Sequence, residues 1–167
     1  MVQKKRLFGP KVQNFRLFYA LLLVLCVGAL VVAYYLQSAQ GLAPCPLCII
    51  QRFGFMWLAV FALCGLLRGR LGWLGNALAA FGGAVAVAVA GYQNWLLINP
   101  SATCVMDDPH KNFVNDLPTA QWWPEMFKVS GSCTAPLEPF LGLQIPLWAL
   151  IALLFVTLGF VIRLIRR

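Results

Sequence analysis

Four long apolar runs separated by polar segments dominate the chain. They cover about residues 15–36, 49–67, 71–97 and 145–164. About 20 residues at a helical rise of roughly 1.5 Å cross a hydrocarbon core of roughly 30 Å, so each run is long enough to span a membrane. The first run is too long for a signal-peptide core, and no clear small-x-small cleavage site follows it. The pattern predicts an all-α membrane protein, residues 1–167 forming one four-transmembrane-helix bundle.

The third run is rich in small residues on one face of the predicted helix. Gly75, Ala79, Gly83 and Gly91 fall on one row with a spacing of four or eight residues. Small side chains allow helices to approach closely in lipid, where van der Waals packing replaces the hydrophobic drive. We expect this row to be a packing face.

Composition and charge support a membrane protein and indicate its orientation. Of the 167 residues 61% are hydrophobic and 11% charged, and the net charge is +8. Ten of the 13 basic residues lie before or at the start of the first run, in the short break near Arg68, or at the end of the last run and beyond it, whereas all five acids lie between the third and fourth runs. The basic residues form no single patch, so we expect no nucleic-acid partner. By the positive-inside rule both termini are cytoplasmic, and the loops at about 37–48 and 98–144 are extracytoplasmic.

Six cysteines fall into two groups. Cys26 and Cys64 lie inside apolar runs, where cysteine usually behaves as a small hydrophobe. The other four lie in the two extracytoplasmic loops: Cys45, Cys48, Cys104 and Cys133. Cysteine pairs persist as disulfides in an oxidising compartment, so these four are the candidate redox residues.

The first cysteine pair forms a Cys-x-x-Cys element, Cys45 to Cys48, at the start of a predicted helix. A helix N-terminus lowers the pKa of a thiol by stabilising the thiolate, which favours disulfide exchange. One alternative is that the four loop cysteines form two inert, structural disulfides. A zinc site is the other, but the sequence has no second Cys-x-x-Cys and no histidine at metal-binding spacing. We therefore expect no metal.

Arg52 lies four residues after Cys48, on the same face of the predicted helix and near its outer end. An arginine at membrane depth is costly and usually marks function. It is suited to hold a thiolate or to donate to a polar head group such as a quinone carbonyl. The alternative is an arginine that snorkels to the interface. In the second loop, Trp122 and Trp123 favour the membrane interface, either as an anchor for a partner-binding loop or as an ordinary aromatic belt.

Four motifs in this order resemble the disulfide bond formation protein B (DsbB) family, across nearly the whole chain. They are Cys45-Pro46-Leu47-Cys48 with Gln51-Arg52, Ala102-Thr103-Cys104, Ser130-Gly131-Ser132-Cys133, and Gly142-Leu143-Gln144-Ile145-Pro146-Leu147-Trp148. The resemblance implies a four-helix bundle in the bacterial inner membrane. It also implies reoxidation of a DsbA-like periplasmic thiol oxidase of the thioredoxin fold, with ubiquinone or menaquinone as the electron acceptor.

The resemblance also implies roles for individual residues. The partner thiolate would attack a Cys104–Cys133 disulfide at Cys104, and the released Cys133 would exchange with Cys45. Cys48 would be the thiolate that faces the quinone, and Arg52 would steady the developing negative charge.

The chain departs from some members at two positions, and two other interpretations stay open. Some well-known members have an acid where this chain has Gln51 and a histidine where it has Asn94, so the quinone contacts are expected to differ. One other interpretation is a non-catalytic four-span membrane protein with structural loop disulfides. The second keeps the redox chemistry but assigns one dedicated partner.

Overall fold

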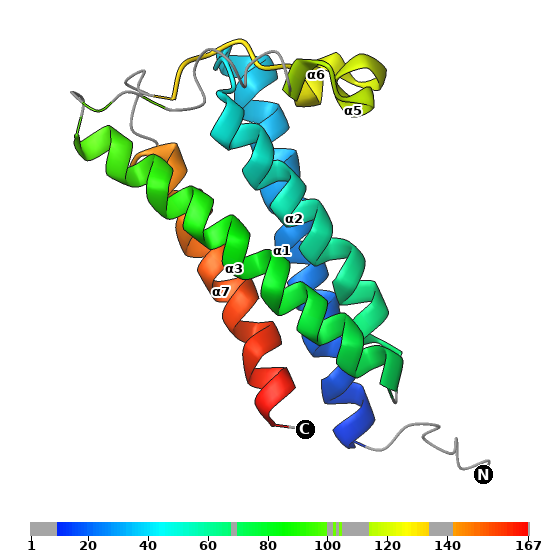
Figure 1. Ribbon diagram of the computed structural model, residues 1–167. Coiled ribbons are helices and arrows are strands. Elements are labelled where there is room, and N and C mark those ends of the chain that lie inside the picture. The colour runs from blue at the N-terminus through cyan, green and yellow to red at the C-terminus, as the bar shows by residue number, and fades with distance from the viewer. Residues whose placement is uncertain are drawn as a thin grey trace.

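The computed structural model describes residues 10–67, 70–99, 102, 104, 114–133 and 142–166, with side chains from residue 16 onward. Four long helices run through it: α1 (Pro10–Gln40), α2 (Pro46–Gly65), α3 (Arg70–Ile98) and α7 (Ile145–Ile165). Each is long and apolar enough to cross a membrane. Figure 1 shows them as one elongated bundle, with the start of α1 and the end of α7 at the end opposite α5 and α6. The prediction of an all-α membrane protein with four transmembrane helices is confirmed.

The helix ends differ from the apolar runs, mainly around the first loop. α1 continues to Gln40, and Gly41 follows it with a φ of 64°, the left-handed conformation that commonly ends a helix. α2 begins at Pro46, whose fixed φ suits the first helical position. The predicted loop of residues 37–48 is therefore reduced to residues 41–45, and the Cys-x-x-Cys element forms the first turn of α2.

The second loop also contains regular structure. Its described residues include two short helices, α5 (Pro118–Trp122) and α6 (Pro124–Phe127), each with a proline in its first turn. Both lie at the end of the bundle where α2 begins (Figure 1). The segment therefore lies over the N-terminus of α2, where the first two cysteines are found.

Small residues allow the long helices to pack closely. Gly75, Ala79 and Gly83 are buried on α3, as expected of the packing row. A Cβ at Gly83 would lie 2.9 Å from Cγ2 of Thr157 on α7. Gly91 differs, because a Cβ there would meet nothing within 4 Å. Close packing along the row is therefore shown near the basic end of α3 and not at Gly91.

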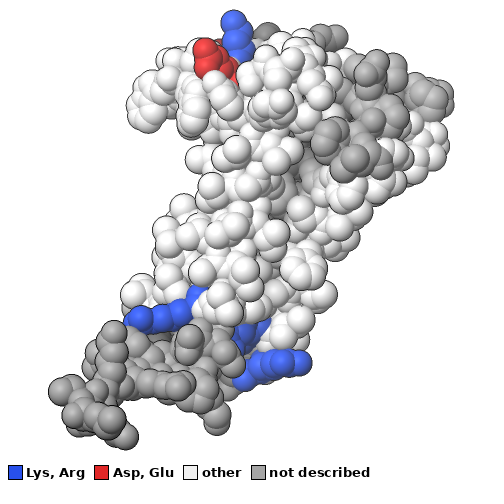
Figure 2. Space-filling view, turned by 180° about the vertical axis from the view of Figure 1, so that it is seen from behind, with Lys and Arg blue, Asp and Glu red and all other residues white. Residues whose placement is uncertain are grey.

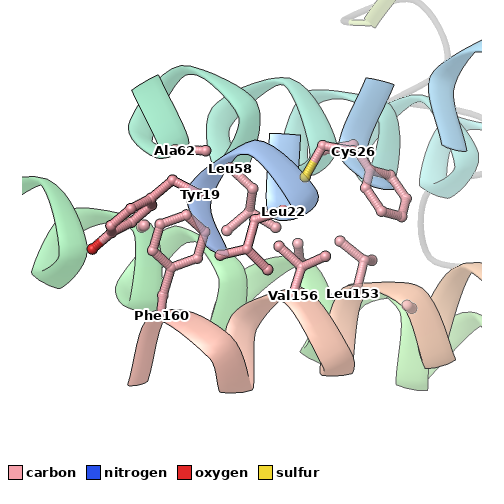
Figure 3. Packing of buried hydrophobic residues seen from close by; sticks show 12 residues of the cluster. Tyr19, Leu22, Cys26, Leu58, Ala62, Leu153, Val156 and Phe160 are labelled. Carbon is pink, nitrogen blue, oxygen red and sulfur yellow. The ribbon is translucent and has the colours of Figure 1, made fainter. Parts of the chain in front are cut away.

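The main hydrophobic core lies between the four long helices. Figure 3 shows Tyr19 and Cys26 of α1 facing Leu58 of α2 and Phe160 of α7. The hydroxyl of Tyr19 donates to Oδ1 of Asn76 over 2.8 Å, so this buried polar pair is satisfied. Cys26 is part of this core, consistent with its expected role as a small hydrophobe.

Charged side chains lie toward the two ends of the described molecule, and large apolar side chains are exposed between them. In the described part of the chain, Arg16, Arg70, Arg163 and Arg166 lie at the end that carries the termini. Figure 2 shows this basic end, and the few charges of the second loop at the other end. The face between them in that view is uncharged, and large apolar side chains are exposed along the helices. Such a band fits a lipid-facing surface. Asp107, Asp108, Glu138 and Arg68 lie outside the described residues.

Candidate functional site

The N-terminus of α2 positions the first cysteine pair. Cys45 is the N-cap residue, and its sulfur accepts a hydrogen bond from the backbone N–H of Cys48 over 3.2 Å. Pro46 follows at the first helical position, so the turn is fixed locally. The two sulfurs lie 2.7 Å apart. Both therefore lie at the positive end of the helix dipole, where a thiolate is stabilised.

The cysteines of both loops come together in one buried cluster. It consists of Cys45, Leu47, Leu96, Cys104 and Cys133, with the half-buried Cys48 packed against it. A hydrogen bond between Cys45 and Cys133, with the bond to Cys48 and burial as further causes, raises the pKa of the Cys45 thiol well above its usual value. Cys45 therefore contacts cysteines of both pairs. The structure brings the four loop cysteines together, and Cys26 and Cys64 are not in this cluster.

A backbone contact between the two loops brings Cys133 to Cys45. The N–H groups of Ser130 and Gly131 both donate to the carbonyl oxygen of Pro44, each over 3.0 Å. A Cβ at Gly131 would lie 3.0 Å from the carbonyl carbon of Ala43 and closer still to its oxygen. Only glycine fits this approach without a shift of the backbone. We call this contact, formed by residues 43–44 and 130–131, the loop clamp.

Arg52 is buried beneath the second loop. Its side chain is only 7% exposed, and Nη1 donates to the carbonyl oxygen of Met126 on α6. On the next residue of α2, the ring of Phe53 stacks on Phe127 with centroids 5.1 Å apart. The guanidinium is therefore enclosed by protein rather than extended to water. It is one turn from Cys48 along α2.

α1 also contacts the second loop. The hydroxyl of Tyr34 donates to Oε2 of Glu125 over 3.2 Å, and Nε2 of Gln37 donates to the backbone oxygen of Glu125 over 2.5 Å. The ring of Tyr34 also packs against Trp123. Trp122 is 85% exposed at the surface. An exposed indole at this end of the bundle is consistent with the expected interfacial position.

Gln93 is a residue of the site that the sequence analysis did not single out. It lies on α3 with its side chain 1% exposed. Its Nε2 donates to the sulfur of Cys45 over 3.2 Å and to that of Cys48 over 3.1 Å. Its Oε1 accepts from Nε2 of Gln51 on α2 over 2.5 Å. A polar side chain inside a predicted span was the available signal, whereas Gln51 and Asn94 were singled out because they depart from some members of the family.

Asn94 is turned away from the sulfurs. Its Nδ2 donates to the carbonyl oxygens of Ala90, over 2.8 Å, and Pro146, over 3.0 Å. Asn94 therefore connects α3 to the first turn of α7, whereas Gln93 reaches the cysteines.

A cavity of about 480 Å³ adjoins the first cysteine pair. Its lining comes from α1, the first loop, α2, α7 and Gln93. The polar side chains near the cysteine pair are Cys48, Gln51, Arg52 and Gln93. The rest of the lining is mainly apolar, including Leu25, Leu36, Phe55 and Trp148. A cavity with apolar walls and a few polar groups is typical of a small-molecule site.

Fold and cysteine cluster together define a multi-pass membrane protein with four loop cysteines gathered at one end of the bundle. Residues 15–162 match the family of disulfide bond formation protein DsbB. A disulfide bond formation protein B of Ralstonia nicotianae is 46% identical over 92% of this chain and 96% of its own length. Proteins of the same name from Cupriavidus metallidurans and Nitrosomonas europaea are 44% and 39% identical, over 92% and 83% of this chain and 95% and 87% of their own lengths. The chain belongs to the DsbB family, as the four motifs indicated.

Proposed function

We propose that this protein reoxidises a DsbA-like periplasmic dithiol oxidase of the thioredoxin fold and passes the electrons to a membrane quinone. The observation that carries the proposal is the position of Cys45. Its thiol is hydrogen-bonded to Cys48 and to Cys133, so it joins the cysteine pairs of the two loops. The pair that would receive electrons from the second loop also adjoins an apolar cavity.

The exchange steps follow from thiolate attack on disulfide sulfurs. A partner thiolate attacks the sulfur of Cys104, the Cys104–Cys133 disulfide breaks, and Cys133 leaves as a thiolate. Cys133 then attacks Cys45, the Cys45–Cys48 disulfide breaks, and Cys48 leaves as a thiolate. The second partner thiol displaces Cys104 from the mixed disulfide, and Cys104 recloses on Cys133 by displacing Cys45. Two electrons have then moved from the partner to Cys45 and Cys48.

The cavity beside Cys48 fits a quinone of either proposed class, ubiquinone or menaquinone. Its apolar walls suit a flat ring, and its volume of about 480 Å³ lies in the range typical of small-molecule sites. Arg52 and Gln51 carry the N–H donors that would hold a carbonyl oxygen, with Cys48 in the same lining. A bound quinone supplies an acceptor for two electrons and two protons. The chain's own contribution is to bring the Cys48 sulfur and these donors to one end of an apolar cavity.

We further propose that the protein lies in the bacterial inner membrane with both termini in the cytoplasm. Four described arginines lie at the end that carries the termini (Figure 2), and basic residues favour the cytoplasmic side. The cysteine cluster at the other end then faces the periplasm, where disulfides form and persist.

Quinone reduction by the purified protein tests the proposal. The protein in detergent is mixed with a reduced thioredoxin-fold periplasmic oxidase and a soluble ubiquinone analogue, and the quinone absorbance is followed. We expect rapid reduction by the wild type and none by Cys48→Ser. Cys64→Ser is the matched control, because it removes a cysteine outside the cluster and should keep the wild-type rate.

Each alternative predicts a different result. Structural disulfides predict no reduction with any partner or either quinone class, and loop cysteines that resist mild reductant. A dedicated partner predicts reduction with one oxidase only. Equal reduction by wild type and Cys48→Ser would refute the role assigned to Cys48.

A further inference from the structure

Two buried amides form a chain that ends on the sulfurs of the first cysteine pair. Gln51 and Gln93 are 4% and 1% exposed. Nε2 of Gln51 donates to Oε1 of Gln93, and Nε2 of Gln93 donates to both Cys45 and Cys48. Both amides lie on membrane-spanning helices, where a polar side chain is costly unless its groups are satisfied.

The strength of the hydrogen bonds from Gln93 depends on the charge of the sulfur atoms that accept them. A neutral thiol sulfur is a weak hydrogen-bond acceptor, so a hydrogen bond to it offsets little of the free-energy cost of burying the amide. Hydrogen bonds to an ionised acceptor are roughly twice as strong as neutral ones. Donation by Gln93 therefore becomes most favourable when one of the two sulfurs carries a negative charge.

We propose that Gln93 is a catalytic residue that stabilises the thiolate of Cys48, and that Gln51 is a positioning residue that fixes the orientation of the Gln93 amide. The inference rests on the proposed function, in which Cys48 is the leaving thiolate. Hydrogen bonds to Cys133 and to Cys48 raise the pKa of Cys45, the other sulfur that Gln93 contacts, so Cys45 ionises less readily than Cys48. The charge that Gln93 meets is therefore on Cys48.

Gln51 determines which end of the Gln93 amide faces the sulfurs. An amide has a donor end and an acceptor end of nearly equal size, and turning it over would direct an oxygen at the thiolate. Because Gln51 donates to Oε1 of Gln93, the NH₂ group is left for Cys45 and Cys48. Neither amide titrates, so this donation persists at every pH at which the protein is folded.

The pH dependence of Cys48 alkylation tests both roles. The protein is fully reduced in detergent and treated with iodoacetamide at a series of pH values, and the extent of Cys48 modification is read by mass spectrometry of its peptide. The variants are Gln93→Met, Gln51→Met and the double variant, since methionine keeps the unbranched shape and lacks the donors. Gln121→Met is the control, because Gln121 is exposed on α5.

We expect the midpoint of Cys48 alkylation to rise by about one to two pH units in Gln93→Met, which is the value of a hydrogen bond to a charged group. Gln51→Met should give a smaller rise. The double variant should match Gln93→Met alone, because a residue that acts through Gln93 adds nothing once Gln93 is gone. Gln93→Asn keeps an amide but shortens the side chain, so it should also raise the midpoint, and it replaces Gln93→Met if that variant does not fold.

An unchanged midpoint in folded Gln93→Met or Gln93→Asn would overturn the role of Gln93. Additive shifts in the double variant would overturn the positioning role of Gln51. The assay uses no quinone and no partner. If the wild type reduces quinone while these midpoints stay unchanged, the inference fails and the proposed function stands.

Discussion

Replacing Gly131 with alanine is expected to weaken the loop clamp and with it the transfer of electrons from Cys133 to Cys45. An added Cβ would lie 3.0 Å from the carbonyl carbon of Ala43 and 3.1 Å from its Cβ, and closer still to the carbonyl oxygen. The atoms near this Cβ include backbone atoms of Ala43, which cannot move away as the end of a long, flexible side chain can. The two loops must therefore separate locally.

The expected magnitude follows from the bonds that would be lost. The N–H groups of Ser130 and Gly131 each donate to Pro44 over 3.0 Å. A typical intramolecular hydrogen bond contributes about 0.5–1.5 kcal/mol net, so losing both costs about 1–3 kcal/mol. That free energy corresponds to a decrease of about 5- to 150-fold in the equilibrium constant for contact between the loops. Pro44 directly precedes Cys45, so the decrease acts on the reacting pair.

A protein carrying Cys48→Ser and Cys104→Ser leaves Cys45 and Cys133 as the only pair in the cluster. Equilibration with glutathione buffers of known ratio, followed by mass spectrometry, gives the equilibrium constant for the Cys45–Cys133 disulfide. Gly131→Ala should lower this constant by the stated factor. The matched control is Gly91→Ala, because a Cβ there meets nothing within 4 Å. Equal constants in the two folded variants would refute the reasoning.

Three further predictions concern other parts of the molecule. Arg52→Ala should lower the rate of quinone reduction about 10- to 100-fold, because a charged hydrogen-bond donor is lost. The variant should still exchange disulfides with its partner. Loss of this exchange with quinone affinity retained would contradict the role of Arg52. Cys133→Ala removes the hydrogen bond that is the main cause of the raised pKa of Cys45. At pH 8 more Cys45 thiolate should then form, and iodoacetamide should modify Cys45 faster than in the wild type. An unchanged rate would argue against the contact between Cys45 and Cys133. Gly83→Ala should place a Cβ too close to Thr157 and destabilise the bundle by about 1–3 kcal/mol. The variant should then unfold at a lower temperature than the wild type in detergent. An equal unfolding temperature would exclude close packing at Gly83.

The sequence predicted the four spans because apolar length is a direct consequence of membrane thickness. Around the first loop the helices extend beyond the predicted spans, because hydropathy marks the lipid crossing, whereas helical hydrogen bonding continues to Gln40 and resumes at Pro46. α5 and α6 were not predicted because each has only five or four residues, too few for a periodic pattern.

The sequence also predicted which residue types carry the candidate chemistry, but not all of their contacts. The loop cysteines and Arg52 were recognisable because such side chains are rare in those positions. Gln93 was not, because no spacing rule relates an amide on the third run to cysteines at the start of the second. The acceptor of Arg52 is a backbone carbonyl of Met126, which no side-chain pattern reveals. Tertiary packing alone brings these groups together.

Two hydrogen-bonded contacts connect the segment before Cys133 to α2 and to the residue before its N-cap. Arg52 of α2 holds Met126, and Pro44, one residue before the N-cap Cys45, holds Ser130 and Gly131. The segment before Cys133 is thus bound to the same end of α2 that carries Cys45 and Cys48. α1 contacts this segment earlier in the sequence, at Glu125. α1 and α7 both line the cavity, and neither supplies the clamp. The clamp therefore joins the start of α2 to the second loop directly, through the backbone of residues 44, 130 and 131.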